Sequence, residues 1–405
     1  MPKAIVWFGI CMMIAIGFVA CGDSNSSSGG DTAETLNLNI SANPNVDLTS
    51  SYTLHKTTLY VDYNAITTQT GFKLAIAYAD INHDGKIDVF LSAGDATTNR
   101  TPVQVLMNNG SNIFSAQTAS VITNVEPGVV HPRKALTGDY NGDGWPDVFV
   151  IGHGYDQPPF PGEYPLLFLS NGNGTLRYVS GFESLVGFHH GGASADIDAD
   201  GDIDIFVADN NAPFFLINDG HGNLTKDTSR LTTEINGKPF FTAELIDIDK
   251  DGYVDLIVGG HEHEGMPTTI YWGSSSGTYK PANKTVLPAV SGWGVVLDFA
   301  VEDINGDGLK DLIINRTGST NFYVGRYIQI LRQTAIRHFS DETASRLTMY
   351  TTLSWFPWLR VQDIDGDGYP DIFIDDKRFC SGQCAWRNNG SGIFSSYTGT
   401  ITPSL

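Results

Sequence analysis

A nine-residue, aspartate-rich pattern occurs six times between residues 80 and 371 of the chain. Each copy reads Asp-x-(Asp/Asn)-x-Asp-Gly-x-x-Asp, and the copies begin at Asp80, Asp139, Asp196, Asp247, Asp303 and Asp363. Successive copies start 51 to 60 residues apart. A repeat of this length is typical of a supersecondary unit that packs against copies of itself, so the pattern constrains the fold more than any other feature.

The sequence around each copy indicates β-strands. An apolar stretch such as residues 74–79 precedes the pattern, and a β-rich run such as residues 148–152 follows it. A second run, for example residues 166–170, ends in a turn rich in Asn and Gly, and a fourth short strand leads to the next copy. Four strands per repeat predict an all-β propeller of six four-stranded blades, and residues 36–70 could add a closing strand or part of a seventh blade.

The pattern should lie between the first and second strands of each blade, and its chemistry favours a hard cation. Positions 1, 3, 5 and 9 offer side-chain oxygens and position 7 a carbonyl, whereas Zn²⁺ or Cu²⁺ would favour His or Cys ligands. Glycine at position 6 permits the sharp bend. One loop alone would also fit a solvated acidic turn, but six complete copies predict about six structural Ca²⁺ ions. The predicted ligands are Asp80, Asn82, Asp84, Lys86, Asp88, Asp139, Asn141, Asp143, Trp145, Asp147, Asp196, Asp198, Asp200, Asp202, Asp204, Asp247, Asp249, Asp251, Tyr253, Asp255, Asp303, Asn305, Asp307, Leu309, Asp311, Asp363, Asp365, Asp367, Tyr369 and Asp371.

The six loops, their strand context and their spacing resemble the FG-GAP and VCBS repeats, which are related to the propeller of integrin α-chains. The resemblance covers roughly residues 55–400. It implies a propeller of six to eight blades, usually extracellular, with calcium loops that stiffen one face. The resemblance does not imply one biochemical activity.

The N-terminal residues indicate export. Residues 1–20 begin with Lys3 and continue with an apolar stretch, as in a signal peptide. Residues 18–21, Phe-Val-Ala-Cys, resemble the lipobox of bacterial lipoproteins, which implies lipidation of Cys21 and a place at the outer membrane or cell surface; simple signal cleavage is the alternative. Residues 21–51 are predicted to form a flexible Ser/Gly-rich tether, followed by the propeller at 52–405.

The net charge bears on the partners of the folded body. At −21, the chain repels nucleic acid phosphates and anionic lipid headgroups, so we expect no nucleic acid partner and membrane contact only through the lipid anchor. Much of the acidity lies in the six loops. Six Ca²⁺ ions would offset more than half of the net charge.

Two cysteines remain in the mature chain beyond the anchor. Cys380 and Cys384 lie in Cys-Ser-Gly-Gln-Cys. Outside the cytoplasm, such a pair across a glycine turn favours a disulfide over a redox or zinc site. We therefore predict a disulfide between these two residues.

The end of the propeller opposite the acidic loops is the expected recognition surface, because connecting loops usually carry function. Exposed aromatic rings beside polar groups suit sugar rings or peptides, although tryptophans also pack between blades. The run His261-Glu-His263-Glu is compatible with a transition-metal site, with proton transfer or with a solvated hairpin loop. The candidate ligand-binding residues are His131, Arg133, His153, His189, His190, His261, His263, Trp355 and Trp358.

Two functions from different classes fit these observations. The first is a surface binding or adhesion module for a glycan or protein ligand. The second is a polysaccharide-degrading, lyase-like enzyme that uses His, Arg or Tyr in a cleft at the same end. The sequence contains no HExxH or P-loop motif and no assignable catalytic residue, so we favour binding. A purely structural envelope component is a third interpretation.

Overall fold

The computed structural model describes residues 35–37, 73–94, 98–108, 113–319, 323–348, 352–374 and 384–398, all within the unit Glu34–Leu405. The predicted signal and Cys21 lie outside the described residues, so the lipid anchor stays a prediction. Cys384 is disulfide-bonded. Cys380 lies outside the described residues, and its pairing with Cys384 also stays a prediction.

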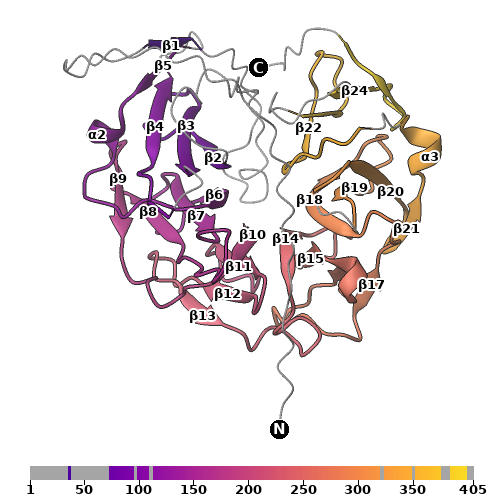
Figure 1. The fold of residues 1–405 in the computed structure, drawn as a ribbon, viewed down its shortest axis with the longest axis horizontal. Helices are drawn as coiled ribbons and strands as arrows, with labels where there is room; N and C mark the ends of the chain where they lie inside the picture. Colours follow the sequence, from indigo (N-terminus) through magenta and orange to yellow (C-terminus); the bar gives the residue numbers. More distant parts are fainter. Residues whose placement is uncertain are drawn as a thin grey trace. The chain divides into compact units, whose positions relative to one another are not determined.

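Six antiparallel sheets form the described unit, one for each copy of the acidic pattern (Figure 1). The prediction of an all-β propeller with six four-stranded blades is therefore confirmed. The strands of blades 1 to 6, in chain order, are β2 (Lys73–Ala79), β3 (Asp88–Gly94), β4 (Gln104–Asn108) and β5 (Ile113–Ala116); β6 (Pro132–Gly138), β7 (Asp147–Gly152), β8 (Leu166–Ser170) and β9 (Leu176–Val179); β10 (His189–Ala195), β11 (Asp204–Asp209), β12 (Phe214–Ile217) and β13 (Thr225–Asp227); β14 (Phe240–Ile246), β15 (Asp255–Gly260), β16 (Thr269–Tyr271) and β17 (Lys284–Val286); β18 (Val295–Glu302), β19 (Asp311–Thr317), β20 (Tyr327–Ala335) and β21 (His338–Asp341); β22 (Arg360–Gln362), β23 (Asp371–Phe373), β24 (Ala385–Asn388) and β25 (Phe394–Ser396).

Each acidic loop joins the first and second strands of its blade, as predicted. The ninth residue of every copy is also the first residue of the second strand, where it pairs with the last residue of the first strand. The acidic loops therefore lie at one end of the strands, which we call the loop end. The connections between strands 2 and 3 and the starts of the first strands lie at the other end, which we call the rim end.

A further short strand, β1 (Thr35–Asn37), pairs with β5 at the outer edge of the first blade. It lies inside the range assigned to the tether by sequence. The described part of residues 36–70 thus extends the first sheet to five strands and belongs to no seventh sheet.

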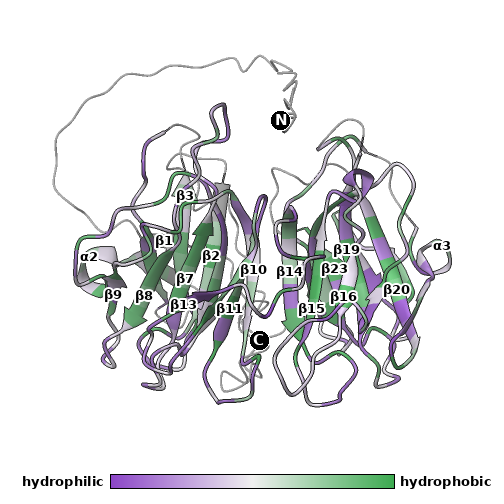
Figure 2. Cartoon of the chain, turned by 90° about the horizontal axis from the view of Figure 1, so that it is seen from below, coloured by the Kyte–Doolittle hydropathy of each residue, from purple (hydrophilic) through white to green (hydrophobic). Residues whose placement is uncertain are grey.

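The space between consecutive blades forms the hydrophobic core. The first strand of each blade lies against the first strand of the next, with β2 on β6, β6 on β10 and β10 on β14 (Figure 1). Glycine allows this approach, because a Cβ on Gly191 would lie 2.7 Å from the carbonyl oxygen of Phe241 on the next blade. Apolar side chains of adjacent sheets interdigitate, as in Phe90 and Phe168, whose ring centroids are 5.0 Å apart. Figure 2 shows the hydrophobic strands and the more hydrophilic loops at their ends.

Helix is nearly absent from the described residues. The helices α2 (Thr118–Val121), η2 (Glu262–Glu264) and α3 (Thr343–Arg346) have three or four residues each. No helix among the described residues has the length and apolar character needed to cross a bilayer.

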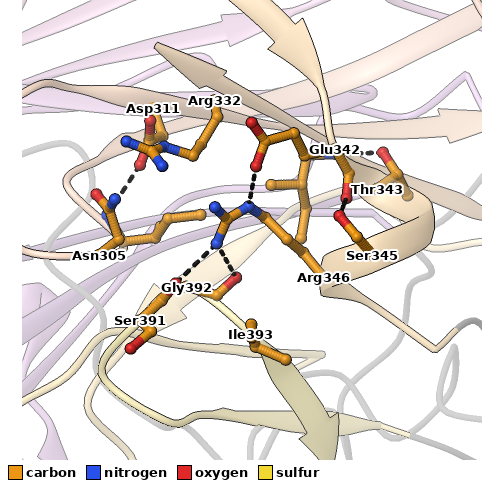
Figure 3. Close-up of polar contacts among 12 residues, drawn as sticks. Asn305, Asp311, Arg332, Glu342, Thr343, Ser345, Arg346, Ser391, Gly392 and Ile393 are labelled. Carbon is orange, nitrogen blue, oxygen red and sulfur yellow. Dashed lines mark hydrogen bonds and ion pairs between the residues drawn. The ribbon is translucent and has the colours of Figure 1, made fainter. Parts of the chain in front are cut away.

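The links that leave blades 1, 3 and 5 run beside the fourth strand of the next blade or beside the connection that precedes it. They form parallel bridges between Ile122 and Leu176, Leu231 and Tyr279, and Leu347 and Phe394. In the last of these links, Arg346 of α3 donates to the carbonyls of Ser391 and Gly392 at 2.7 and 3.0 Å and pairs with Glu342 (Figure 3). These contacts join each of the three links to the outer part of the next blade.

Candidate metal loops and the opposite rim

The first aspartate of each acidic loop organises the loop backbone. One carboxylate oxygen accepts the N–H of position 5 and the other accepts the N–H of position 6 in all six copies. In the first loop, Asp84 and Gly85 donate to Asp80 at 2.9 and 2.8 Å. The carboxylate of position 5 in turn accepts the N–H of position 7. The six loops therefore share one hydrogen-bonding pattern.

The ninth aspartate ties the loop to its blade. It is at most 1% exposed in every copy. One oxygen accepts the N–H of position 2, and the other accepts an N–H near the end of the third strand. In the fourth blade, Ile248 and Gly273 donate to Asp255 at 2.9 and 2.7 Å. The sequence pattern assigns this residue only as a metal ligand, whereas the structure also gives it a role in joining strands.

The glycine at position 6 is required by backbone conformation. Its φ lies between 81° and 98° in the six copies, and a Cβ there would meet no atom within 4 Å. Space is therefore available, but the left-handed conformation disfavours other residues. Position 4 is left-handed as well, with glycine in three copies and His83, Ala199 and Lys250 in the others. Two left-handed residues thus bend each loop around its carboxylates.

The donor set of the loops fits calcium. In each of three loops, oxygens of three aspartates lie within 4.8 Å of one another. The third loop contributes Asp196, Asp198 and Asp204; the fourth contributes Asp247, Asp249 and Asp251; the sixth contributes Asp363, Asp365 and Asp371. Oxygen is the donor that Ca²⁺ prefers. Basic side chains offset part of the charge, as where Arg230 pairs with Asp198 and Arg387 with Asp367. Arg332 has the same place beside the fifth loop, near Asp311 (Figure 3).

Burial of the ninth aspartates predicts a pH dependence for the metal-free protein. Burial raises the pKa of Asp88, Asp147, Asp204 and Asp255 to about 7 and that of Asp311 and Asp371 to about 6. The protonated form then stabilises the fold, and this contribution is complete below the unfolded-state pKa of about 4 and is lost as the pH rises through 6 to 7. Burial lowers the pKa of His190 and of His261, and both act in the opposite direction, but these two groups oppose six. We expect the Tm in metal-free buffer to fall by about 5 °C or more from pH 5 to pH 8, measured by thermal unfolding; a rise would contradict this prediction.

At the rim end, a one-residue bulge interrupts the pairing of the first and second strands in blades 2 to 5. The extra residues are Arg133, His190, Phe241 and Leu297, each six positions before the first aspartate of its loop. A bulge leaves its extra residue out of the ladder and redirects the side chain. These side chains meet across blades, because His190 stacks on Phe241 at 4.2 Å and Phe241 packs with Leu297.

Imidazole and phenyl rings form a continuous strip at the rim of blades 2, 3 and 4. We call it the imidazole strip, and its members are His131, His153, Phe188, His190, Phe241, His261 and His263. Successive ring centroids are 3.7 to 5.1 Å apart. Burial, with the nearby His153 and Arg133, lowers the pKa of His190 well below its usual value, so this central ring is neutral at pH 7. The strip brings together five of the ligand-binding residues predicted from the sequence, namely His131, His153, His190, His261 and His263.

His189 points elsewhere and supports the structure of the rim. Its Nδ1 lies 2.8 Å from a carboxylate oxygen of Asp209, and its Nε2 lies 2.8 Å from the carbonyl oxygen of Leu185. Both ring nitrogens thus lie beside oxygen acceptors, which fix the orientation of the ring. Burial raises the pKa of Asp209, but its hydrogen bond and ion pair with His189 outweigh burial and leave the pKa below its usual value.

The run from His261 to Glu264 is more than a solvated hairpin loop. Glu262 forms a bidentate ion pair with the fully buried Arg316 at 2.7 and 3.1 Å. Glu264 lies between the two imidazoles, 3.2 Å from His261 and 3.5 Å from His263. Glu262 therefore points inward to Arg316, whereas His261, His263 and Glu264 form a separate cluster nearer the surface.

The two predicted tryptophans connect blade 6 to the rest of the rim. Trp355 and Trp358 are half-buried. Trp355 packs on the cluster that contains Phe241, and the guanidinium of Arg133 lies 5.5 Å from the ring of Trp358. Residues from blades 2, 4 and 6 thus meet at the rim end.

Phe160, in the connection between β7 and β8, is not among the candidate residues predicted from the sequence. Phe160 is 51% exposed and has a φ of 53°, which is unusual for a residue other than glycine. Its ring lies edge-on to Phe188 of the imidazole strip at 5.8 Å. An exposed phenyl ring in a strained conformation points to a functional loop. The only signal in the sequence is its position between Pro159 and Pro161.

The fold and the six loops define a propeller built from repeats. The chain belongs to the family of FG-GAP-like repeat proteins, because that family's model matches residues 80–150, 196–258, 247–314 and 303–374. These matches include all six acidic loops. The resemblance seen in the sequence is thereby confirmed for the FG-GAP repeat. No match was found among curated proteins.

Solved structures resemble this chain at low sequence identity. A lectin from Agrocybe aegerita, described for its specific recognition of non-reducing terminal N-acetylglucosamine, has a TM-score of 0.51 and 17% identity over 80% of this chain and 79% of that chain. The V. cholerae biofilm matrix protein Bap1 has a TM-score of 0.38 and 16% identity over 74% and 42% of the two chains. A GH43 glycoside hydrolase has a TM-score of 0.35 and 12% identity over 79% and 61%. At these identities the likeness concerns the fold alone.

Proposed function

We propose that this protein is an exported propeller, anchored by a lipid on Cys21 at the outer membrane or cell surface, which holds about six structural Ca²⁺ ions and binds a glycan or protein ligand at its rim end. The observation that carries the binding proposal is the exposed Phe160 beside the imidazole strip. Aromatic faces next to polar groups suit sugar rings and peptide side chains.

The calcium part of the proposal rests on the donor chemistry of the loops. Every ligand position offers oxygen, and two left-handed residues bend each loop around its carboxylates. The ninth aspartate also bonds the second and third strands of its blade. Ion binding at this residue would therefore stabilise the folded blade, which gives the ion a structural role.

Phe160 tests the rim as the binding surface. If a glycan stacks on this ring, Phe160→Ala should weaken binding by up to about tenfold, since a stacking contact on an aromatic ring contributes about 0.5–1.5 kcal/mol and about 1.4 kcal/mol corresponds to tenfold. A glycan array with the whole chain, beginning with terminal N-acetylglucosamine, identifies a ligand, and titration calorimetry compares the variants. The lectin that shares the fold suggests that starting sugar.

The matched control for this prediction is Ile336→Ala. Ile336 is 59% exposed in the hairpin between β20 and β21, at the loop end. Its replacement should leave the affinity unchanged. Equal affinities of the two variants for a ligand that the parent binds would exclude Phe160 from the binding surface.

The anchor is tested separately. Cells that express the full chain are fed a radiolabelled fatty acid, and the label should appear on the parent protein and be lost in Cys21→Ser. A labelled Cys21→Ser variant would contradict lipidation at this residue.

Cleavage of a polysaccharide is the second candidate function, and one observation favours it. His190 is neutral at pH 7 because burial lowers its pKa, and the cationic Arg133 lies close enough to influence it. A neutral imidazole beside a guanidinium can remove a proton next to a carboxylate, the first step of an eliminative lyase. Ultraviolet absorbance of an unsaturated product from acidic polysaccharides, lost in His190→Gln, would replace the binding proposal with this one.

A further inference from the structure

Two histidines of the imidazole strip lie together with a carboxylate in the second blade. One ligand atom from each of His131, His153 and Asp156 lies within 4.8 Å of the other two. His131 and His153 are 3% and 2% exposed, whereas Asp156 is exposed. His131 immediately precedes β6, His153 immediately follows β7, and Asp156 lies three residues further on. The group thus has a buried nitrogen side and an open oxygen side.

The backbone around the two histidines is held by a buried carboxylate. Glu163 is 2% exposed and accepts the N–H groups of Val130, His131 and Gly154, each at 2.9 Å. In addition, the N–H of His153 donates to the carbonyl of His131 at 3.1 Å. Glu163 is therefore a positioning residue that joins the two segments and fixes the separation of the two imidazoles.

The ring of His153 has a defined tautomer. Its Nδ1 lies 2.9 Å from the carbonyl oxygen of Gly154, which can only accept a hydrogen bond. Nδ1 therefore carries a hydrogen, which in the neutral form of the ring leaves the lone pair on Nε2. Metal-binding imidazoles are commonly held in this way, with the second nitrogen donating to a carbonyl or a carboxylate.

We propose that His131, His153 and Asp156 bind one divalent transition-metal ion of the zinc class. Two imidazoles and one carboxylate suit such an ion, whereas Ca²⁺ prefers oxygen donors alone. Three protein ligands leave a coordination position open, and the exposed side of Asp156 faces solvent. This site uses the rim end of the blade and none of the acidic loops, so it is independent of the proposed calcium ions.

The test is a titration of the full chain with Zn²⁺ in excess Ca²⁺, so that calcium occupies the acidic loops. We expect one ion at this site, detected by calorimetry and by native mass spectrometry. His153→Gln should weaken binding by about 100-fold, and Asp156→Asn and Glu163→Gln by about tenfold each. With Co²⁺ as the probe, the visible absorption bands of a bound ion should appear in the parent and be absent from His153→Gln.

The control variant is His221→Gln, which removes an exposed histidine in the turn before β13 and should bind Zn²⁺ like the parent. Asp156 is exposed, so Asp156→Asn keeps the test valid if His153→Gln fails to fold. Unchanged affinity in both His153→Gln and Asp156→Asn would overturn the proposal. Loss of binding in His263→Gln alone would place the ion instead at His261, His263 and Glu264, a second group with ligand atoms within 4.8 Å.

Discussion

Removal of calcium by a chelator is expected to lower the Tm of the propeller by about 20 °C. An ion that binds only the folded state stabilises it by about 2.7 kcal/mol when the free ion exceeds its Kd a hundredfold. Six independent ions would contribute about 16 kcal/mol, and each kcal/mol shifts the Tm of a domain of this length by roughly 1–2 °C. The crowded carboxylates of each loop, which calcium would neutralise, act in the same direction.

The measurement is thermal unfolding of residues 32–405 with calcium and with chelator, combined with counting of bound metal by mass spectrometry. Six ions per chain and the large shift would support the calcium loops. Mg²⁺ at the same concentration should restore much less of the Tm, because it demands a smaller octahedral shell. If no metal is bound and the Tm does not change, calcium must be removed from the proposal. The six-bladed fold would still stand on its own evidence.

The fold was predictable because its signal is local and repeated. Each copy of the acidic pattern marks one strand-to-strand connection, and the spacing of 51 to 60 residues leaves room for four strands. Side-chain alternation and the Asn/Gly turns then fix the hairpins. The number of blades follows from the number of loops. The sequence allowed for an added strand within residues 36–70 but did not locate β1, because its three residues Thr35–Asn37 carry no pattern and depend on the edge that β5 offers.

The candidate rim was only partly predictable, because its contacts are non-local. The sequence selects His131, His153 and His190 by residue type, but their contact depends on three segments of two blades. The bulges that redirect Arg133 and His190 are visible only in the strand register. Glu163 looks like any loop glutamate in the sequence, although it is buried and accepts three backbone N–H groups.

Asp255→Ala is expected to destabilise even the metal-free protein by about 4 kcal/mol. The substitution leaves the N–H groups of Ile248 and Gly273 without their acceptor in a buried setting, and each such group costs about 1–3 kcal/mol. Unfolding by urea in metal-free buffer at pH 5 measures the effect. At this pH the side chain of Asp255 is protonated, because burial raises its pKa to about 7. The loss of stability therefore reports the lost hydrogen bonds and includes no gain from removing a buried charge.

The control in the same blade is Asp249→Asn, at position 3 of the loop. Asparagine already stands at this position in three copies, as Asn82, Asn141 and Asn305, so the loop accepts it. The change removes a partly exposed ion pair with Arg337, worth about 1 kcal/mol or less. If both variants lose equally little free energy of unfolding, the ninth aspartate acts only as a metal ligand. If Asp255→Ala loses far more, each acidic loop also joins the strands of its blade, with or without metal.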